Sequence, residues 1–208
     1  MGRQTKPMAA GDLAGLVGSR LCHDLVSPLG AIGNGVELLQ MSPDFPGIGD
    51  SPEMQLIGDA VASARGRIQG YRMAFGLAAG DQRVSHGELT RLVQGMSAQG
   101  RLRVQLDASG DVARAETRMV LLALMCLETA MPWGGRVLAL RTTPGWRLVA
   151  ECDRARLDPD LWAWLDGSRP ARAPQPSEVQ FALLAEAATE AGRSLQAEMD
   201  EGGGEISF

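Results

Sequence analysis

The sequence predicts an α+β protein in which two long helices precede a mixed unit of helices and strands. Within residues 1–80, two long stretches show the apolar spacing of helices, and a short run rich in Pro, Gly and Asp separates them. After residue 80, stretches in which apolar and polar residues alternate are interleaved with apolar helical stretches. We therefore expect a helical-hairpin domain over residues 1–80 and an α/β domain over residues 81–208.

The first domain is predicted to be a pair of antiparallel helices. Asp12 is a candidate N-cap for a helix that ends near Met41, and the segment SPDFPGIGDSP over residues 42–52 predicts a turn. A second amphipathic helix is expected from about residue 53 to residue 79. Two such helices cannot bury both of their apolar faces alone, so we expect a homodimer that forms a four-helix bundle.

The second domain is predicted to contain strands joined by hairpins, with helices on one face of the sheet. Pro132 ends its most apolar helix, and Pro144-Gly145 is the turn of a strand hairpin. In chain order, we expect a helix at 88–96, a strand at 101–108, a helix at 115–131, strands at 136–143 and 146–153, a short helix at 158–167, a loop at 168–176, a helix at 177–192, and strands at 194–200 and 204–208.

The composition excludes several classes of protein. The net charge is -5 and there is no basic block, which argues against nucleic-acid binding. Lys6 is the single lysine, so neither a P-loop nor a protein-kinase strand lysine can be built. No apolar run reaches membrane-spanning length and the start lacks a signal peptide, so we expect no membrane contact and a cytoplasmic location. The three cysteines lack CxxC spacing, which argues against a disulfide framework and a zinc site.

His23, one of two histidines in the chain, lies opposite the apolar side of the first predicted helix. At about 100° per residue, Ser27, Gly30 and Asn34 share its face and Arg20 flanks it. We therefore expect the imidazole to face solvent. The expected buried stripe on the opposite side consists of Val17, Leu21, Leu25, Pro28, Ile32, Val36 and Leu39.

Pro28 is an unusual residue to find inside this helix. It removes a hydrogen bond to the carbonyl of Asp24 and crowds the same turn, at a cost of about 3 kcal/mol. Such a cost is easier to understand beside a functional site than on an idle surface. A lone exposed histidine without a role is the alternative.

The segment HDLVSPL over residues 23–29 resembles the H-box of sensor histidine kinases, usually His-Glu/Asp-Leu-Arg-Thr/Ser-Pro-Leu. It departs from that pattern at Val26, where arginine is common. The longer run SRLCHDLVSPLGAIGNGVELL over residues 19–39 is similar to the ChpT-type histidine phosphotransferases, which are dimeric relay proteins built like a kinase without kinase activity. The order of predicted elements resembles this family over the whole chain, whereas the sequence motif matches only in the first helix.

This resemblance implies a two-step phosphoryl transfer. His23 would attack the phosphorus of an aspartyl-phosphate on a receiver domain, because a neutral imidazole nitrogen is nucleophilic. A second receiver's aspartate would then take the group from the phosphohistidine. The implied partners are the receivers of a hybrid histidine kinase and of response regulators. The receiver would bring Mg²⁺ and a lysine, so no cofactor of the chain's own is expected.

The resemblance also implies roles for the neighbours of His23. Asp24 would hold the imidazole in its reactive tautomer or accept its proton, and Arg20 would offset phosphoryl charge. Ser27 would bind phosphoryl oxygens or position a water for dephosphorylation. Gly30 and Asn34 complete the expected binding face. The glycines of the helix either leave room for a partner helix or simply weaken the helix: Gly30, Gly33 and Gly35.

The segment LLALMCLETAMPWGGRVLAL resembles the N-box helix and the following strand of a kinase ATP-binding domain. The Mg²⁺-binding asparagine of that motif would fall near Cys126, and Asn34 is the only asparagine in the chain. ECDRARLDPD stands where DxGxG is expected, and SRPARAPQP stands where a glycine-rich lid is expected. The resemblance therefore implies a degenerate ATPase-like domain, kept as a docking surface for receivers.

Two rival functions remain open from the sequence: an ATP-dependent histidine kinase, and a noncatalytic dimeric adaptor with an inert His23. His86 is either a second phosphorylation site or a linker or helix-capping residue. The acidic segment LDPDLW fits a helix start better than a metal cluster. The four tryptophans fit core or domain packing: Trp133, Trp146, Trp162 and Trp164.

Overall fold

A computed structural model describes residues 9–76, 81–97, 102–143, 145–168 and 170–208. The chain divides into two compact units, residues 1–77 and residues 78–208. The first consists of helices and the second is mixed, as the sequence predicts. The predicted boundary between residues 80 and 81 adjoins a stretch outside the described residues, so its exact place stays a prediction.

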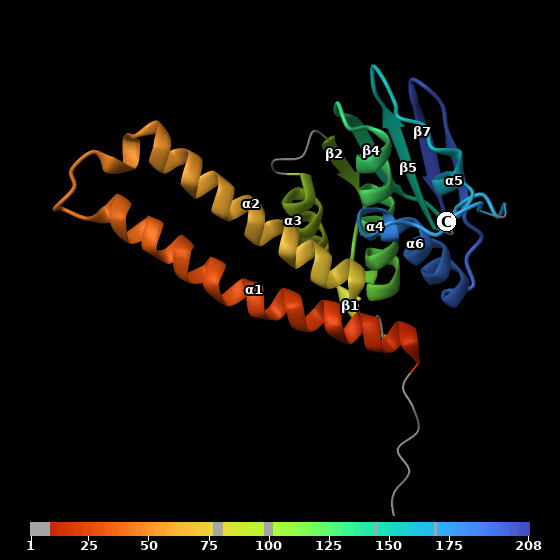
Figure 1. Cartoon of the computed structure of the whole chain (residues 1–208), viewed down its shortest axis with the longest axis horizontal. Helices are drawn as coiled ribbons and strands as arrows, with labels where there is room; N and C mark the ends of the chain where they lie inside the picture. The colour runs from red at the N-terminus through yellow and green to blue at the C-terminus, as the bar shows by residue number, and fades with distance from the viewer. Residues whose placement is uncertain (1–8, 77–80, 98–101, 144, 169) are drawn as a thin grey trace, which may run out of the picture. The chain divides into compact units, whose positions relative to one another are not determined.

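The first unit is a hairpin of two long helices, α1 (Ala10–Met41) and α2 (Pro52–Phe75), with the short 3-10 helix η1 (Ile48–Asp50) between them (Figure 1). Ser51 caps α2, because its Oγ accepts a hydrogen bond of 3.2 Å from the backbone N–H of Met54. Asp12 is not the N-cap of α1: the helix starts two residues earlier, and Asp12 lies in its first turn. There its charge still favours the helix dipole. The helix continues through Pro28.

Small residues form the face of α1 that packs on α2. Gly15, Cys22, Gly33 and Val36 are buried on this face. A Cβ atom added to Gly33 would lie 2.9 Å from Arg65 Nη1 and 3.4 Å from Val61 Cγ1. The helices therefore approach closely where α1 lacks side chains. From α2, the buried residues are Met54, Ser63, Gly70, Met73 and Ala74.

The apolar stripe that the sequence predicts as buried is exposed in the single chain, apart from Val36. Leu21 is 59% exposed and Leu25 is 51% exposed. For the single chain the prediction is wrong, because α2 packs on the neighbouring face, which is formed by small residues, about 100° away around the helix. Exposed residues of the stripe are Val17, Leu21, Leu25, Pro28, Ile32 and Leu39.

A five-stranded sheet forms the centre of the second unit, with the strand order β2-β4-β5-β7-β6. β2 and β4 are parallel, and the other neighbours are antiparallel. A separate pair, β1 with β3, was not predicted because strands of two residues show no alternation. The bounds are β1 (Arg83–Val84), β2 (Leu102–Asp107), β3 (Val112–Ala113), β4 (Gly135–Arg141), β5 (Trp146–Glu151), β6 (Gln196–Met199) and β7 (Gly203–Ser207).

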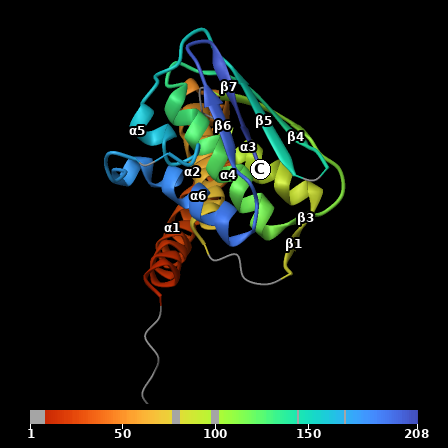
Figure 2. The ribbon, with the colours of Figure 1, turned by 90° about the vertical axis from the view of Figure 1, so that its right-hand side faces the viewer.

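Helices cover one face of this sheet, and Figure 2 shows α4 and α6 beside strands β5, β7 and β6. Helix α4 connects β2 to β4, and this crossover explains why these two strands are parallel. The predicted helices and the β4–β5 hairpin are confirmed, within a few residues at their ends except for α5, which spans only Pro159–Trp162 of the helix expected at 158–167. The helix bounds are α3 (His86–Ser97), α4 (Arg114–Ala130), α5 (Pro159–Trp162), η2 (Pro176–Glu178) and α6 (Val179–Glu190).

The core of the second unit lies between the sheet and α4. Alternate strand residues that face this core are buried, among them Val137, Leu148 and Ile206. Helix α4 is buried around most of its circumference, as a central helix should be. Across the described residues, no helix has the length and apolar character needed to span a membrane.

The four tryptophans do not share one environment. Trp146 is buried, and Trp162 packs edge-on against Phe181 with 5.9 Å between the ring centroids. Trp133 is 57% exposed, with the Arg154 guanidinium 4.3 Å from its ring centroid. The prediction of a packing role is therefore wrong for Trp133, because its turn between α4 and β4 projects into solvent.

Candidate functional site

His23 lies near the middle of α1, and its side chain is 76% exposed. The structure confirms the exposure that the helical spacing predicts. Exposure results from the helix geometry, since His23 lies about 95° from the face that packs on α2 and farther from the exposed apolar stripe. The imidazole is thus accessible to a large partner such as a folded domain.

The Asp24 carboxylate contacts both the imidazole of His23 and the guanidinium of Arg20. His23 Nδ1 lies 3.1 Å from Asp24 Oδ1, and Arg20 Nε donates a hydrogen bond of 2.8 Å to Asp24 Oδ2. The hydrogen bond with His23, followed by the hydrogen bond and the positive charge of Arg20, lowers the pKa of the Asp24 carboxyl. Asp24 is therefore an ionised acceptor at neutral pH, and Nδ1 carries the proton when the imidazole is neutral.

Ser27 and Asn34 are exposed, as His23 is, while Gly30 is half-buried. A Cβ atom on Gly30 or Gly35 would meet nothing within 4 Å, whereas one on Gly33 would meet α2 of the same chain. Among the three glycines, only Gly33 thus serves close helix packing within the chain. The other two leave open surface on α1.

His86 belongs to the other unit, where it is the first residue of α3 and is exposed. Ser85, not His86, caps this helix through a hydrogen bond of 3.2 Å from Glu88 N–H to Ser85 Oγ. His86 contributes its backbone carbonyl, which accepts a hydrogen bond of 2.9 Å from Thr90 Oγ1. Among the described residues, no acidic side chain pairs with its imidazole as Asp24 pairs with that of His23.

Cys126 stands where the resemblance would place a Mg²⁺-binding asparagine. It is completely buried within α4, and burial raises the pKa of its thiol. A protonated thiol in an apolar core is a poor ligand for Mg²⁺, which prefers oxygen atoms. In the described part of the chain, no group of three or more His, Cys, Asp or Glu residues is arranged to hold a metal ion.

Arg172 ties the loop before α6 to two helices. Its guanidinium donates to Glu178 Oε2 at 2.6 Å and to Asp158 Oδ2 at 2.9 Å. Asp158 also caps α5, since its Oδ1 accepts from Asp160 N–H at 3.1 Å, so the acidic segment is a helix start as predicted. Glu178 also accepts from Gln175 N–H at 2.8 Å. The loop at the expected position of a lid is thus fastened at Arg172.

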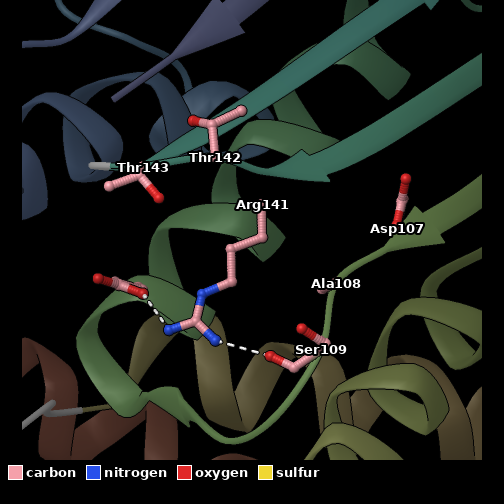
Figure 3. Close-up of a pocket in the computed structure, with 8 residues that line it drawn as sticks. Asp107, Ala108, Ser109, Arg141, Thr142 and Thr143 are labelled. Atoms are coloured by element: carbon pink, nitrogen blue, oxygen red, sulfur yellow. Dashed lines mark hydrogen bonds and ion pairs between the residues drawn. The ribbon is translucent and has the colours of Figure 1, made fainter.

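A pocket of about 450 Å³ lies beside the ends of β2 and β4 (Figure 3). Arg141 extends across it and donates hydrogen bonds of 2.9 Å and 3.1 Å to the carbonyls of Ser109 and Asp111. Its guanidinium also lies 4.0 Å from Glu116. The sequence gives no signal for this pocket. Because Arg141 is already engaged by these oxygen atoms, it serves as a brace between strand and loop.

The family model described as "Histidine phosphotransferase C-terminal domain" matches residues 86–203, which are more than half of the chain. The chain belongs to this family. The match begins at the first residue of α3, so this histidine phosphotransferase is assigned through its α/β unit. The helix that carries His23 lies outside the matched residues.

The chain is similar to one curated protein in sequence and to one solved structure in fold. Protein phosphotransferase ChpT of Brucella abortus (strain 2308) is 45% identical over 71 residues, which cover 34% of this histidine phosphotransferase and 32% of that protein. The match therefore spans about a third of that relative's length. A solved bacterial phosphotransferase is 24% identical with a TM-score of 0.65, covering 97% of this chain and 98% of its own. It has the same fold over nearly the whole chain.

Proposed function

We propose that this histidine phosphotransferase acts in a multistep phosphorelay and moves phosphoryl groups between receiver-domain aspartates through a phosphohistidine on His23. The observation that carries the proposal is the exposed imidazole whose Nδ1 lies 3.1 Å from an ionised Asp24. Family membership and the similarity to a ChpT protein support it.

The geometry gives the atoms of the reaction their roles. Nε2 attacks the phosphorus of the aspartyl-phosphate, a bond from Nε2 to phosphorus forms, and the bond from phosphorus to the receiver's carboxylate oxygen breaks. The proton on Nδ1 stays in the hydrogen bond with Asp24 Oδ1, and the negative carboxylate stabilises the positive charge that develops on the ring. In the second step, another receiver's aspartate attacks the same phosphorus and Nε2 leaves.

The partners follow from this reaction. They are the receivers of a hybrid histidine kinase and of response regulators, and each would supply the Mg²⁺ and the lysine that neutralise phosphoryl charge. Ser27 and Asn34 lie exposed on the same helix and would contact the receiver or the phosphoryl oxygens. Gly30 would let the receiver approach, because a Cβ atom at this position would meet nothing within 4 Å.

We propose further that two copies of the chain associate through α1. Burial of one leucine side chain stabilises by roughly 1.5–3 kcal/mol, and α1 leaves a stripe of such side chains uncovered. Association would complete a four-helix bundle, in which the His23 side chains stay on the outside. A cytoplasmic location is proposed from the free thiols Cys22, Cys126 and Cys152, which suit a reducing compartment.

The experiment that tests phosphotransfer is incubation with a phosphorylated receiver domain and Mg²⁺. Acid-labile label should appear on the wild type and on His86→Ala, and His23→Gln should abolish it. His86→Ala is the matched control, since it removes the other exposed histidine of the chain. Transfer by His23→Gln from one receiver to another would favour the noncatalytic adaptor instead.

The chain is also proposed to have no kinase activity of its own. The burial of Cys126 and the fastening of the loop at Arg172 support this, because both occupy positions that a nucleotide site would need. Incubation with radiolabelled ATP and Mg²⁺, without any receiver, should leave His23 unlabelled. Label on His23 in that mixture would establish the rival histidine kinase.

A further inference from the structure

Arg20, Asp24 and His23 form a chain of side chains in which each oxygen of the carboxylate has its own partner. Arg20 Nε binds Oδ2 at 2.8 Å, while His23 Nδ1 meets Oδ1 at 3.1 Å. The carboxylate is therefore held at two points. The contact with Arg20 and the contact with His23 together fix the orientation of the carboxylate plane.

Neighbours in sequence do not normally face each other on a helix. His23 and Asp24 point about 100° apart, so a direct contact requires the carboxylate to lean toward the imidazole. Arg20 lies one turn earlier, at an angle between these two residues. Helical side chains lean toward the N-terminus, so both His23 and Asp24 extend over the turn that holds Arg20. Arg20 is thus placed to draw Asp24 toward the imidazole.

We propose that Arg20 is a positioning residue for phosphotransfer, which fixes the Asp24 carboxylate against His23 Nδ1 and so leaves Nε2 as the attacking nitrogen. This inference rests on the proposed function of His23. It gives Arg20 a role different from the direct offset of phosphoryl charge that the resemblance implies, since Arg20 Nε donates to Asp24.

Two effects of Arg20 oppose each other. Its positive charge makes the carboxylate a weaker acceptor, whereas its hydrogen bond orders the carboxylate. The side chains of Arg20 and Asp24 are 75% and 49% exposed, so water screens the charge effect strongly. The ordering effect does not depend on long-range electrostatics and therefore dominates.

The first test measures the tautomer of His23 by ¹⁵N NMR of the whole chain, at a pH of about 8.5, where a histidine is neutral. Arg20→Gln should lower the fraction of imidazole that carries the proton on Nδ1, and Arg20→Lys should restore most of it. Arg136→Gln is the matched control, because it removes the same charge from an exposed ion pair of the other unit. An unchanged tautomer in Arg20→Gln would overturn the proposal.

The second test is a double-mutant cycle on the rate of phosphoryl transfer from a receiver. Arg20→Gln should slow transfer about two- to fivefold, the worth of an exposed ion pair, and should have no further effect in an Asp24→Ala background. An equal loss in both backgrounds would show that Arg20 acts on the phosphoryl group itself, and the proposal would be wrong.

The two tests separate this inference from the function on which it rests. The NMR measurement needs no receiver and no phosphoryl group. If the wild type accepts no phosphoryl group while its tautomer responds to Arg20 as expected, the proposed function fails and the positioning of His23 by Arg20 stands.

Discussion

His23 combines high exposure with an ordered hydrogen-bond partner. Most exposed histidines in proteins are free to rotate, whereas the ring of His23 has one nitrogen engaged by Asp24 and one directed elsewhere. The proposed phosphotransfer needs this combination, because neither a buried ring nor a freely rotating one would present a single nitrogen to the phosphorus on a folded partner.

Ser27 lies one turn after His23, so we expect its hydroxyl to reach a phosphoryl group on Nε2. We expect Ser27→Ala to slow transfer about tenfold, which corresponds to the loss of one hydrogen bond to a charged group. Single-turnover transfer from a phosphorylated receiver measures this effect. Ser19→Ala, one turn before His23, is the control, and an equal loss there would point to a general effect on the helix.

The same variant separates two roles for the hydroxyl. If Ser27 positions a water for dephosphorylation, Ser27→Ala should lengthen the lifetime of the phosphohistidine while transfer stays unchanged. If it binds phosphoryl oxygens, transfer slows and the lifetime of the isolated phosphohistidine changes little. Following label loss without an acceptor receiver distinguishes these outcomes.

At the scale of the elements, the glycines of α1 differ in what surrounds them. A Cβ atom on Gly35 would meet open space, so Gly35→Ala should raise the free energy of unfolding by about 0.5–1 kcal/mol through helix propensity. On Gly33 the same atom would lie 2.9 Å from Arg65 Nη1, so the side chain of Arg65 must move. Gly33→Ala should therefore gain less than Gly35→Ala, as measured by urea unfolding. A larger gain at Gly33 would contradict the close packing of α1 on α2.

The contacts of Arg172 predict how the free energy of unfolding changes with pH. The hydrogen bond from Arg172, and after it the one from Gln175 N–H, lowers the pKa of the Glu178 carboxyl. A lowered folded pKa gives stability that is fully present above the unfolded value of about 4.3. That stability is lost as the pH falls through the lower folded value.

We therefore expect Arg172→Ala to reduce the free energy of unfolding at pH 7, because the variant loses the hydrogen bonds from Arg172 to Glu178 and Asp158. The variant should also lose less stability than the wild type between about pH 5 and pH 3, because its Glu178 titrates closer to the ordinary value. Thermal unfolding over this pH range measures both effects. Arg136→Ala, which breaks a fully exposed pair, should change neither, and parallel pH curves for wild type and Arg172→Ala would contradict the role of Arg172.

The sequence predicted the helices and the β4–β5 hairpin because their apolar spacing is strong and their ends carry Pro and Gly. It missed β1 and β3, which are too short to show a period, and the pairing of β2 with β4, which depends on the path of α4. The exposure of His23 was predictable from helix geometry alone. The hydrogen bond from Arg20 to Asp24 was not, since spacing shows which residues are neighbours but not which of several acceptors a guanidinium will choose.

The face of α1 that packs on α2 is a second feature that residue spacing alone did not predict. The sequence marked the large apolar residues as buried, yet the single chain buries the small ones next to them. Periodicity identifies an apolar stripe but does not say which stripe packs within the chain and which packs between chains. A helix in the proposed four-helix bundle would have both.

At the scale of the whole molecule, the exposed stripe of α1 predicts an oligomer. Ile32 belongs to this stripe and is 50% exposed, whereas Leu16 lies on the side of His23 and is 44% exposed. Ile32→Glu places a charge in the proposed interface and should shift the dimer toward monomer by at least tenfold in dissociation constant, since a buried unpaired charge costs several kcal/mol.

Leu16→Glu makes the same change in charge and nearly the same change in hydrophobicity as Ile32→Glu, but outside the proposed interface. It should therefore leave the dissociation constant unchanged. Sedimentation equilibrium over a range of concentrations measures both variants against the wild type, and circular dichroism confirms that the helices remain. A monomeric wild type, or equal weakening by both variants, would contradict an interface on this stripe. If Ile32→Glu alone dissociates the protein, its His23 should still accept phosphoryl groups at a reduced rate, because the imidazole and Asp24 belong to the same helix.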